Sequence, residues 1–287
     1  MRKYLFSTFT ILALVFPLSV QALSIGDLKP QVDTSTITAK SVVVLNQVTG
    51  ELLYEQGGAD ARVPASLVKL TTVLVALDLP LNWNARCTVG EQDRVGGVSI
   101  TKAGERKTYT LNALLYATLL PSANDAATAL ARCSGLSRAD YLARMQAKVA
   151  AQGAVATTFA DFSGMSGQNK TTAVDLAKIA NAAFSTEKVR TITRTQSYRL
   201  CPVGAACQTI RTTNQLLQDK ELTTIAGKTG TLDGAINFAG SFRDPKGRYF
   251  IVVVLGGSTK ESRFAEAKQL VQFATVRQDW SDLFASR

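Results

Sequence analysis

The chain of 287 residues contains no histidine. A Ser-His-Asp triad is therefore impossible, and a zinc site would lack the imidazole ligands that zinc commonly uses. If a serine is the nucleophile, a different side chain must accept its proton. A lysine one helical turn away is the strongest candidate in this sequence, and Ser66 and Lys69 form such a pair.

Long apolar runs are scarce as well, and the longest lies at the N-terminus. Arg2 and Lys3 precede an apolar run, and the tripeptide ending at Ala22 suits cleavage before Leu23. We therefore predict that residues 1–22 are a signal peptide. The run is short for a membrane span of about 20 apolar residues, so we expect no stable membrane anchor and a periplasmic or secreted protein.

Cysteine is limited to four residues, Cys87, Cys133, Cys201 and Cys207. The C-x5-C spacing of the last two suits zinc poorly and no histidine completes such a site, so we predict disulfides in an oxidising compartment and no metal. Four cysteines allow three pairings. A local Cys201–Cys207 bridge across the Pro and Gly between them is the simplest, and it leaves Cys87 with Cys133.

Acidic residues are fewer than basic ones, 22 against 32, which gives a formal net charge of +10. Residues 1–22 carry two basic and no acidic side chains, so the mature chain carries +10 − 2 = +8. The basic residues are scattered and the chain is predicted to be exported, so nucleic acid is not an expected partner. Two interpretations remain, an ordinary soluble basic surface or attraction to anionic polymers and membrane surfaces of the envelope.

No internal repeat, low-complexity tract or long linker divides the chain, so we predict that residues 23–287 form one domain. Strand patterns lie near both ends and helical patterns lie between them. This order predicts an α/β (α+β) fold, with an antiparallel sheet covered by helices and an inserted all-helical lobe at about residues 82–218. The predicted strands are residues 41–45, 51–54, 223–231, 235–242 and 248–255, and the predicted helices begin at residues 64, 110, 125, 138, 172 and 260.

Three short strings contain the groups of a serine acyl-transfer site: Ser66-Leu-Val-Lys69, Ser122-Ala-Asn124 and Lys228-Thr-Gly230. Ser66 is predicted in the first turn of a helix, where backbone N–H groups favour developing negative charge. Burial and a second cation, for which Lys228 is the candidate, would lower the pKa of Lys69 so that it accepts a proton. Gly230 would let a substrate strand approach. Taken singly, the strings also fit a helix lysine, a helix cap and a solvated strand end.

Together, in this order, the strings resemble the penicillin-recognising serine enzymes, which carry S-x-x-K, S-x-N and K-T-G. Over roughly residues 35–275 the chain is most similar to the low-molecular-mass D-alanyl-D-alanine carboxypeptidases and endopeptidases. The sequence around the motifs also resembles this family, at residues 64–70, 121–126, 171–177 and 227–231. The resemblance implies a β-lactamase/transpeptidase-like catalytic domain, peptidoglycan stem peptides as substrates, β-lactams as covalent inhibitors and no cofactor.

The resemblance implies a role for each matching residue. Ser66 attacks the D-Ala-D-Ala carbonyl, Lys69 takes its proton, and Ser122 passes that proton to the departing amine. The acyl-enzyme is then hydrolysed by water.

Substrate binding is implied for the remaining positions. Asn124 binds the peptide, Lys228 and Thr229 hold the terminal carboxylate, and the Thr231 and Ser66 backbone N–H groups form the oxyanion hole. Family members often carry histidine where this chain has Thr231. The chain also ends soon after its last predicted helix, which favours a soluble endopeptidase over a membrane-bound carboxypeptidase.

Two other functions share these motifs. A class A β-lactamase depends on a glutamate for deacylation, and residues 159–172 offer only Asp161, which we expect in a surface loop. A non-catalytic peptidoglycan-binding or sensor protein would have lost a catalytic residue, and none is missing. Whether the scissile bond is terminal or in a cross-link stays open, because groove shape decides it.

Overall fold

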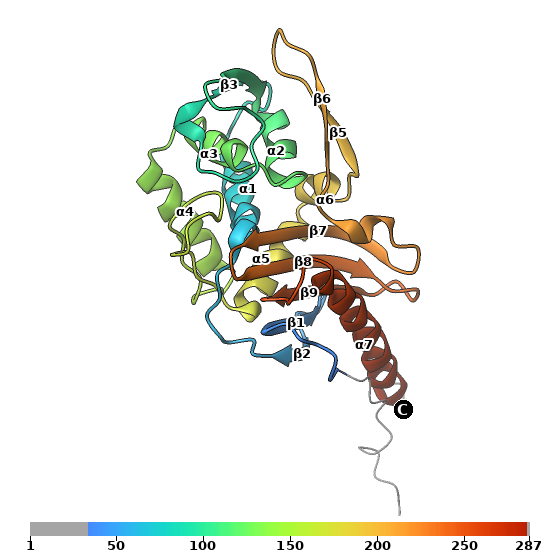
Figure 1. Ribbon diagram of the computed structural model, residues 1–287. Coiled ribbons are helices and arrows are strands. Elements are labelled where there is room, and N and C mark those ends of the chain that lie inside the picture. The colour runs from blue at the N-terminus through green and yellow to red at the C-terminus, as the bar shows by residue number, and fades with distance from the viewer. Residues whose placement is uncertain (1–33, 286–287) are drawn as a thin grey trace, which may run out of the picture. The chain divides into compact units, whose positions relative to one another are not determined.

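A five-stranded antiparallel sheet in the order β2-β1-β9-β8-β7 forms the centre of the computed structural model, which describes residues 34–285 (Figure 1). Strand β1 (Ser41–Asn46) from the start of the chain pairs with β9 (Tyr249–Leu255) from its end. The edge strands are β2 (Leu52–Gln56) and β7 (Thr223–Leu232), and β8 (Ala235–Arg243) lies between β7 and β9. The predicted antiparallel sheet is confirmed. The predicted signal peptide lies outside the described residues.

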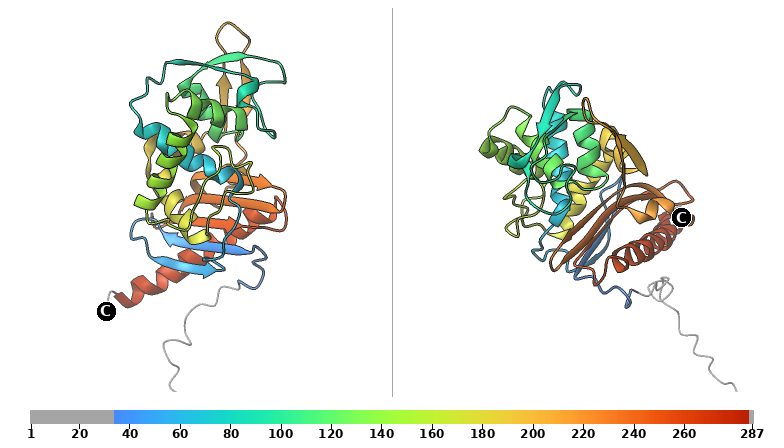
Figure 2. Two further views of the ribbon diagram at one scale, coloured as in Figure 1. Left: turned by 90° about the vertical axis from the view of Figure 1, so that its left-hand side faces the viewer. Right: turned by 45° about the horizontal axis from the view of Figure 1, so that its top comes forward.

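Helices cover both faces of this sheet (Figure 2). Helix α7 (Ser262–Ala285) packs on one face, where Phe264 joins the phenylalanines of β8 and β9 in a buried cluster. Helix α5 (Ala173–Ser185) packs on the opposite face. The sequence placed the end of the last helix near residue 275, about three turns too early.

The lobe beside the sheet contains five helices: α1 (Val68–Asp78), α2 (Leu111–Leu119), α3 (Asn124–Arg132), α4 (Arg138–Ala151) and α6 (Glu187–Thr193). It also contains two antiparallel hairpins, β3 (Arg86–Val89) with β4 (Lys107–Thr110), and β5 (Ser197–Leu200) with β6 (Gln208–Arg211). The prediction of an all-helical lobe is therefore wrong. Each of these strands has only four residues, too few for a clear period-two pattern.

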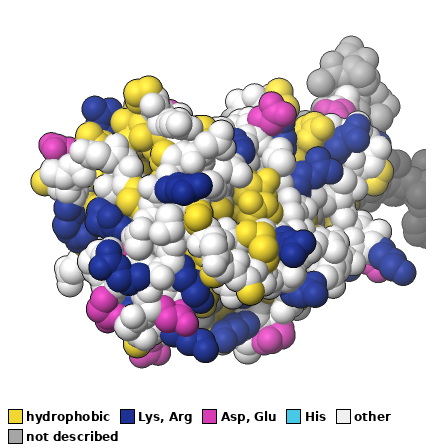
Figure 3. Space-filling model, turned by 90° about the horizontal axis from the view of Figure 1, so that it is seen from above, with side chains coloured by type: hydrophobic (Ala, Val, Ile, Leu, Met, Phe, Trp, Pro, Cys, Tyr) yellow, Lys and Arg dark blue, Asp and Glu magenta, His cyan; other side chains and the backbone are white. Residues whose placement is uncertain are grey.

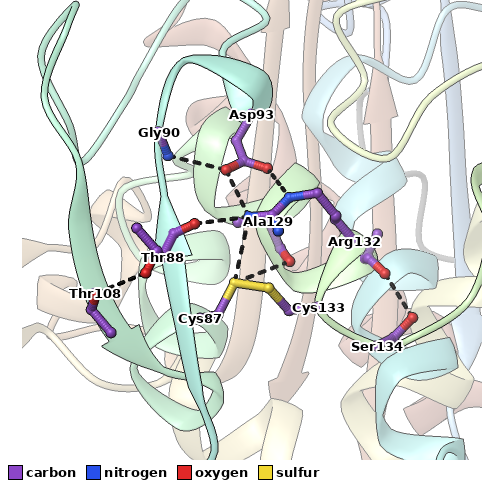
Figure 4. The surroundings of a disulfide bond; sticks show 10 residues. Cys87, Thr88, Gly90, Asp93, Thr108, Ala129, Arg132, Cys133 and Ser134 are labelled. Carbon is purple, nitrogen blue, oxygen red and sulfur yellow. Dashed lines mark hydrogen bonds and ion pairs between the residues drawn. A yellow bond between two sulfur atoms is a disulfide. The ribbon is translucent and has the colours of Figure 1, made fainter.

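Two disulfides fasten these hairpins. Cys87–Cys133 joins β3 to the end of α3, and Cys201–Cys207 closes the β5–β6 hairpin. Next to the first bridge, Arg132 pairs with the buried carboxylate of Asp93, at 2.8 Å from Nε to Oδ1 (Figure 4). The simplest pairing inferred from the sequence is confirmed.

Basic side chains do not gather in one patch on the face shown in Figure 3, where Lys and Arg lie among acidic and apolar side chains. No helix among residues 34–285 is long and apolar enough to cross a membrane.

Candidate active site

Ser66 lies in a single 3-10 turn, η2 (Ala65–Leu67), which leads directly into α1. The turn packs against β7 and β8, so Ser66 sits at the junction of the sheet and the lobe. Ala65 has a left-handed backbone with φ +50°, and Ser122 has φ +67°. They are the only non-glycine residues with positive φ in the described chain, and such strain concentrates at functional sites.

Lys69 is completely buried one turn after Ser66. Its Nζ lies 2.9 Å from Ser66 Oγ, 2.6 Å from Asn124 Oδ1 and 2.6 Å from the Ser163 carbonyl oxygen. A protonated lysine donates three hydrogen bonds, whereas a neutral one donates two and keeps a lone pair. Two of the three partners only accept, so a neutral Lys69 points its lone pair at Ser66. The geometry suits proton abstraction from Ser66.

Burial lowers the pKa of Lys69 from 10.5 to about 7, against the opposing charges of Asp161 and Asp125. Burial also lowers the pKa of Lys228 well below its usual value, with further repulsion from Lys69 and Arg263. The expected lowering of the Lys69 pKa has burial as its main cause. Lys228, the expected second cation, interacts electrostatically with Lys69.

Ser122 and Lys228 form a second pair. Lys228 Nζ donates to Ser122 Oγ at 2.7 Å and to the Thr229 carbonyl at 2.8 Å, and both side chains are buried. Ser122, from the segment between α2 and α3, thus meets Lys228 from β7. Lys228 is held inside the protein rather than solvated, which removes the alternative of an ordinary strand-end lysine.

Asn124 is the first residue of α3, and the helix is capped at Ala123 without a side-chain hydrogen bond. The predicted cap is therefore wrong. Asn124 Oδ1 accepts from Lys69, and Nδ2 donates to the Gly96 carbonyl at 2.8 Å. The neighbouring Asp125 carboxylate instead anchors a loop, through the backbone N–H groups of Ile100 and Thr101.

Gly230 serves the packing of the site. A Cβ at this position would lie 2.7 Å from the Pro64 carbonyl oxygen and 3.4 Å from Ala65 Cβ. The missing side chain therefore lets β7 approach the turn that carries Ser66. Gly230 was expected to make room for a substrate strand, but the chain that approaches it in the structure is the protein's own backbone. Thr229 Oγ1 lies 2.6 Å from Thr213 Oγ1, while Thr231 is exposed.

Arg263 joins the site from the first turn of α7 and was not predicted from the sequence. Its Nη1 donates to Thr231 Oγ1 at 2.9 Å and lies 3.4 Å from the Gly230 carbonyl, and the residue is buried. It adds a third basic side chain near Lys228 and Lys69. No local signal marked this arginine, because an arginine near a helix start is ordinary on a protein surface.

Asp161 lies in a loop, as expected, and is half-buried there. Its carboxylate accepts from the backbone N–H groups of Ser163, Gly164 and Ser166. This loop supplies the carbonyl that binds Lys69, a contact that was also not predicted from the sequence. The carboxylate oxygens are thus occupied within their own loop, which gives the β-lactamase alternative no support. No group of three acidic or cysteine residues in the described chain is arranged to hold a metal ion.

Comparison with known proteins agrees with this geometry. The family model described as D-alanyl-D-alanine carboxypeptidase matches residues 28–259. A D-alanyl-D-alanine endopeptidase of Haemophilus influenzae is 30% identical over 194 residues, which are 67% of this chain and 66% of that protein. The D-alanyl-D-alanine carboxypeptidase DacB2 of Mycobacterium tuberculosis is 31% identical, with 78% of this chain and 76% of that protein matched. The crystal structure of the Streptomyces K15 DD-transpeptidase is similar at a TM-score of 0.77 and 28% identity, covering 84% of this chain and 98% of that one.

Proposed function

The chain belongs to the D-alanyl-D-alanine carboxypeptidase family, and on this premise we propose that it cleaves D-Ala-D-Ala bonds of peptidoglycan stem peptides through an acyl-enzyme on Ser66. The family inferred from the three motifs, the enzyme class of serine D-Ala-D-Ala peptidases and the β-lactamase/transpeptidase-like fold are confirmed. The observation that carries the proposal is the contact of Lys69 Nζ with Ser66 Oγ at 2.9 Å.

In the proposed acylation, Ser66 Oγ attacks the carbonyl carbon of the penultimate D-Ala while its proton moves to Lys69. The C–N bond then breaks, and the departing amine takes a proton through Ser122, which Lys228 holds in place at 2.7 Å. The Ser66 and Thr231 backbone N–H groups are the proposed oxyanion hole. A water molecule then attacks the ester and releases the shortened peptide, with Lys69 again as the base.

Recognition of the substrate would depend on the basic side chains around β7. The terminal carboxylate would meet Thr231 and Thr229, near the buried side chains of Arg263 and Lys228. Asn124 would hold the peptide through its side-chain amide. A β-lactam carries a similar carboxylate and a reactive carbonyl, so we expect it to acylate Ser66 and inhibit the enzyme.

We place this activity outside the cytoplasm, in the periplasm or secreted, where peptidoglycan is found. Two disulfides support this location, because such bonds persist in oxidising compartments. Nucleic acid is not a proposed partner, and no cofactor takes part in the proposed chemistry.

Incubation with two peptidoglycan fragments tests the proposal: free pentapeptides and cross-linked dimers, analysed by mass spectrometry. Loss of one terminal alanine identifies a carboxypeptidase, and conversion of dimers to monomers identifies an endopeptidase. The Ser66→Ala variant is the control and should change neither fragment. If the wild-type protein leaves both fragments intact, the proposed function is wrong.

A further inference from the structure

Asp161 is tied to the backbone of its own turn by an unusual number of hydrogen bonds. Its Oδ1 accepts from Gly164 N at 2.6 Å and Ser163 N at 3.1 Å, and its Oδ2 accepts from Ser166 N at 2.7 Å. Asn169 Nδ2 adds a fourth donor at 3.1 Å. A carboxylate with several backbone N–H donors fixes a turn tightly, because each charge-assisted bond is short and strong.

The turn that Asp161 organises presents two successive carbonyl oxygens to α1. Phe162 O accepts from Thr72 Oγ1 at 2.7 Å, and Ser163 O accepts from Lys69 Nζ at 2.6 Å. The Phe162 ring anchors the turn further, since it is buried against Tyr141 at 5.2 Å between centroids. The position of the Ser163 carbonyl is thereby fixed relative to Lys69.

The same turn also presses against the backbone of the nucleophile. Gly164 has φ +84°, and a Cβ there would lie 2.8 Å from Ser66 N and overlap the Ala65 carbonyl. Only a glycine in a left-handed conformation fits this contact. The turn therefore touches both members of the Ser66–Lys69 pair.

We propose that Asp161 is a positioning residue of the acylation step: by folding residues 161–166 it holds the Ser163 carbonyl on one N–H of Lys69 and so directs the amine lone pair at Ser66. This inference rests on the proposed roles of Ser66 and Lys69. Asn124 Oδ1 takes the second N–H, so the two acceptors together leave one direction for the lone pair.

The charge of Asp161 has a second consequence for Lys69. It opposes the effect of burial, as does Asp125 from α3, and so keeps the pKa of Lys69 at about 7 rather than lower. The other titratable groups at the site are the basic side chains of Lys228 from β7 and Arg263 from α7. A base works best when its pKa lies near the working pH, because a weaker base accepts the proton less readily.

The test is the pH dependence of acylation by a fluorescent penicillin in the wild-type protein, Asp161→Asn and Asp161→Glu, with Asp140→Asn as the control. Asp140 is an exposed carboxylate in the first turn of α4, in the same lobe. We expect Asp161→Asn to lower the maximal rate on the order of 10²-fold, as misplacement of a reacting group does. In the plot of acylation rate against pH, the rise for this variant should occur at lower pH than the wild-type rise near 7. Asp140→Asn should match the wild-type protein.

Asp161→Glu keeps the charge and changes the reach of the carboxylate. Its maximal acylation rate should therefore fall, while the pH at which the rate rises stays close to that of the wild-type protein. It also provides the test if Asp161→Asn does not fold, as judged by circular dichroism and thermal unfolding. The proposal is overturned if a folded Asp161→Asn protein has the wild-type acylation rate. It is also overturned if that rate is lower but still rises at the wild-type pH. So does an Asp161→Glu protein with the wild-type rate. A wild-type protein that penicillin does not label would instead overturn the proposed function.

Discussion

Lys69 Nζ lies 2.9 Å from Ser66 Oγ, and the two side chains come from adjoining turns of one continuous helical segment. The contact is therefore local in the chain, and the helix itself sets its geometry. The other two partners of Lys69, Asn124 and Ser163, lie 55 and 94 residues away and come from different parts of the lobe. The helix thus places Lys69 next to Ser66, and two remote residues hold the Lys69 amine through hydrogen bonds.

Replacement of Ser66 by Ala should abolish covalent labelling by penicillin, because Ser66 has the one hydroxyl in the described chain that hydrogen-bonds to the Lys69 amine. The protein should remain folded, since only one half-exposed oxygen is removed. Mass spectrometry of the intact protein after incubation with a β-lactam measures the adduct. Ser185→Ala, which changes an exposed serine at the end of α5, should label like the wild-type protein. A stable adduct on the Ser66→Ala protein would contradict the assignment.

The rate of acylation should rise with pH and level off above about 7, the pKa of Lys69. The sign follows from the base role: only the neutral amine accepts the Ser66 proton, and its fraction falls about tenfold per pH unit below the pKa. Stopped-flow labelling between pH 5 and 9 measures this profile. Lys69→Arg should remove labelling at every pH, because arginine stays charged throughout this range. A rate that still rises tenfold per pH unit up to pH 9, without levelling off, would show an ordinary lysine.

Arg263→Gln should weaken recognition of the terminal carboxylate. The variant loses a buried charge and the hydrogen bond to Thr231, and a hydrogen bond to a charged group contributes about 1.5–3 kcal/mol. We expect kcat/KM for a peptide ending in D-Ala-D-Ala to fall by roughly 10- to 100-fold, with less effect on the corresponding peptide amide. Arg243→Gln is the control, because Arg243 is exposed at the far end of β8 and contacts the Tyr249 ring. Equal losses on the acid and the amide would argue against a role in carboxylate binding.

The two disulfides should contribute unequally to the free energy of unfolding. Cys87 and Cys133 are 46 residues apart, whereas Cys201 and Cys207 are 6 apart. In the chain-entropy description a longer closed loop stabilises more, which gives about 4 kcal/mol for the first bridge and about 2 kcal/mol for the second. Guanidinium unfolding of the two double Cys→Ser variants measures both losses. This prediction is wrong if loss of the Cys201–Cys207 bridge lowers the free energy of unfolding more than loss of the Cys87–Cys133 bridge.

Much of the site could be predicted from the sequence because its groups come in short strings. Ser66 and Lys69 lie on one helix, and Lys228 to Thr231 lie on one strand, so their spacing alone places them together. The order of the strings and the family pattern then identified the enzyme class. The central sheet was predictable for a similar reason, since β1 and β9 are buried runs rich in Val, Ile, Leu and Phe between clear turns.

The hairpins of the lobe and the end of α7 were predicted poorly, because their patterns are short or weak. Four-residue strands such as β3 and β5 are held by pairing and by disulfides rather than by a periodic apolar face. Tertiary context decides such elements, so a local pattern cannot reveal them.

The sequence by itself determined that Ser66 and Lys69 lie one helical turn apart and that no histidine is present. Only the tertiary structure decided which groups hold the Lys69 amine and where Arg263 lies. The Ser163 carbonyl is a backbone group that no residue type encodes, and Arg263 comes from α7, 32 residues after Thr231. Hydrogen bonds of this kind depend on the distance between segments that meet only when the chain has folded, so spacing along the sequence does not specify them.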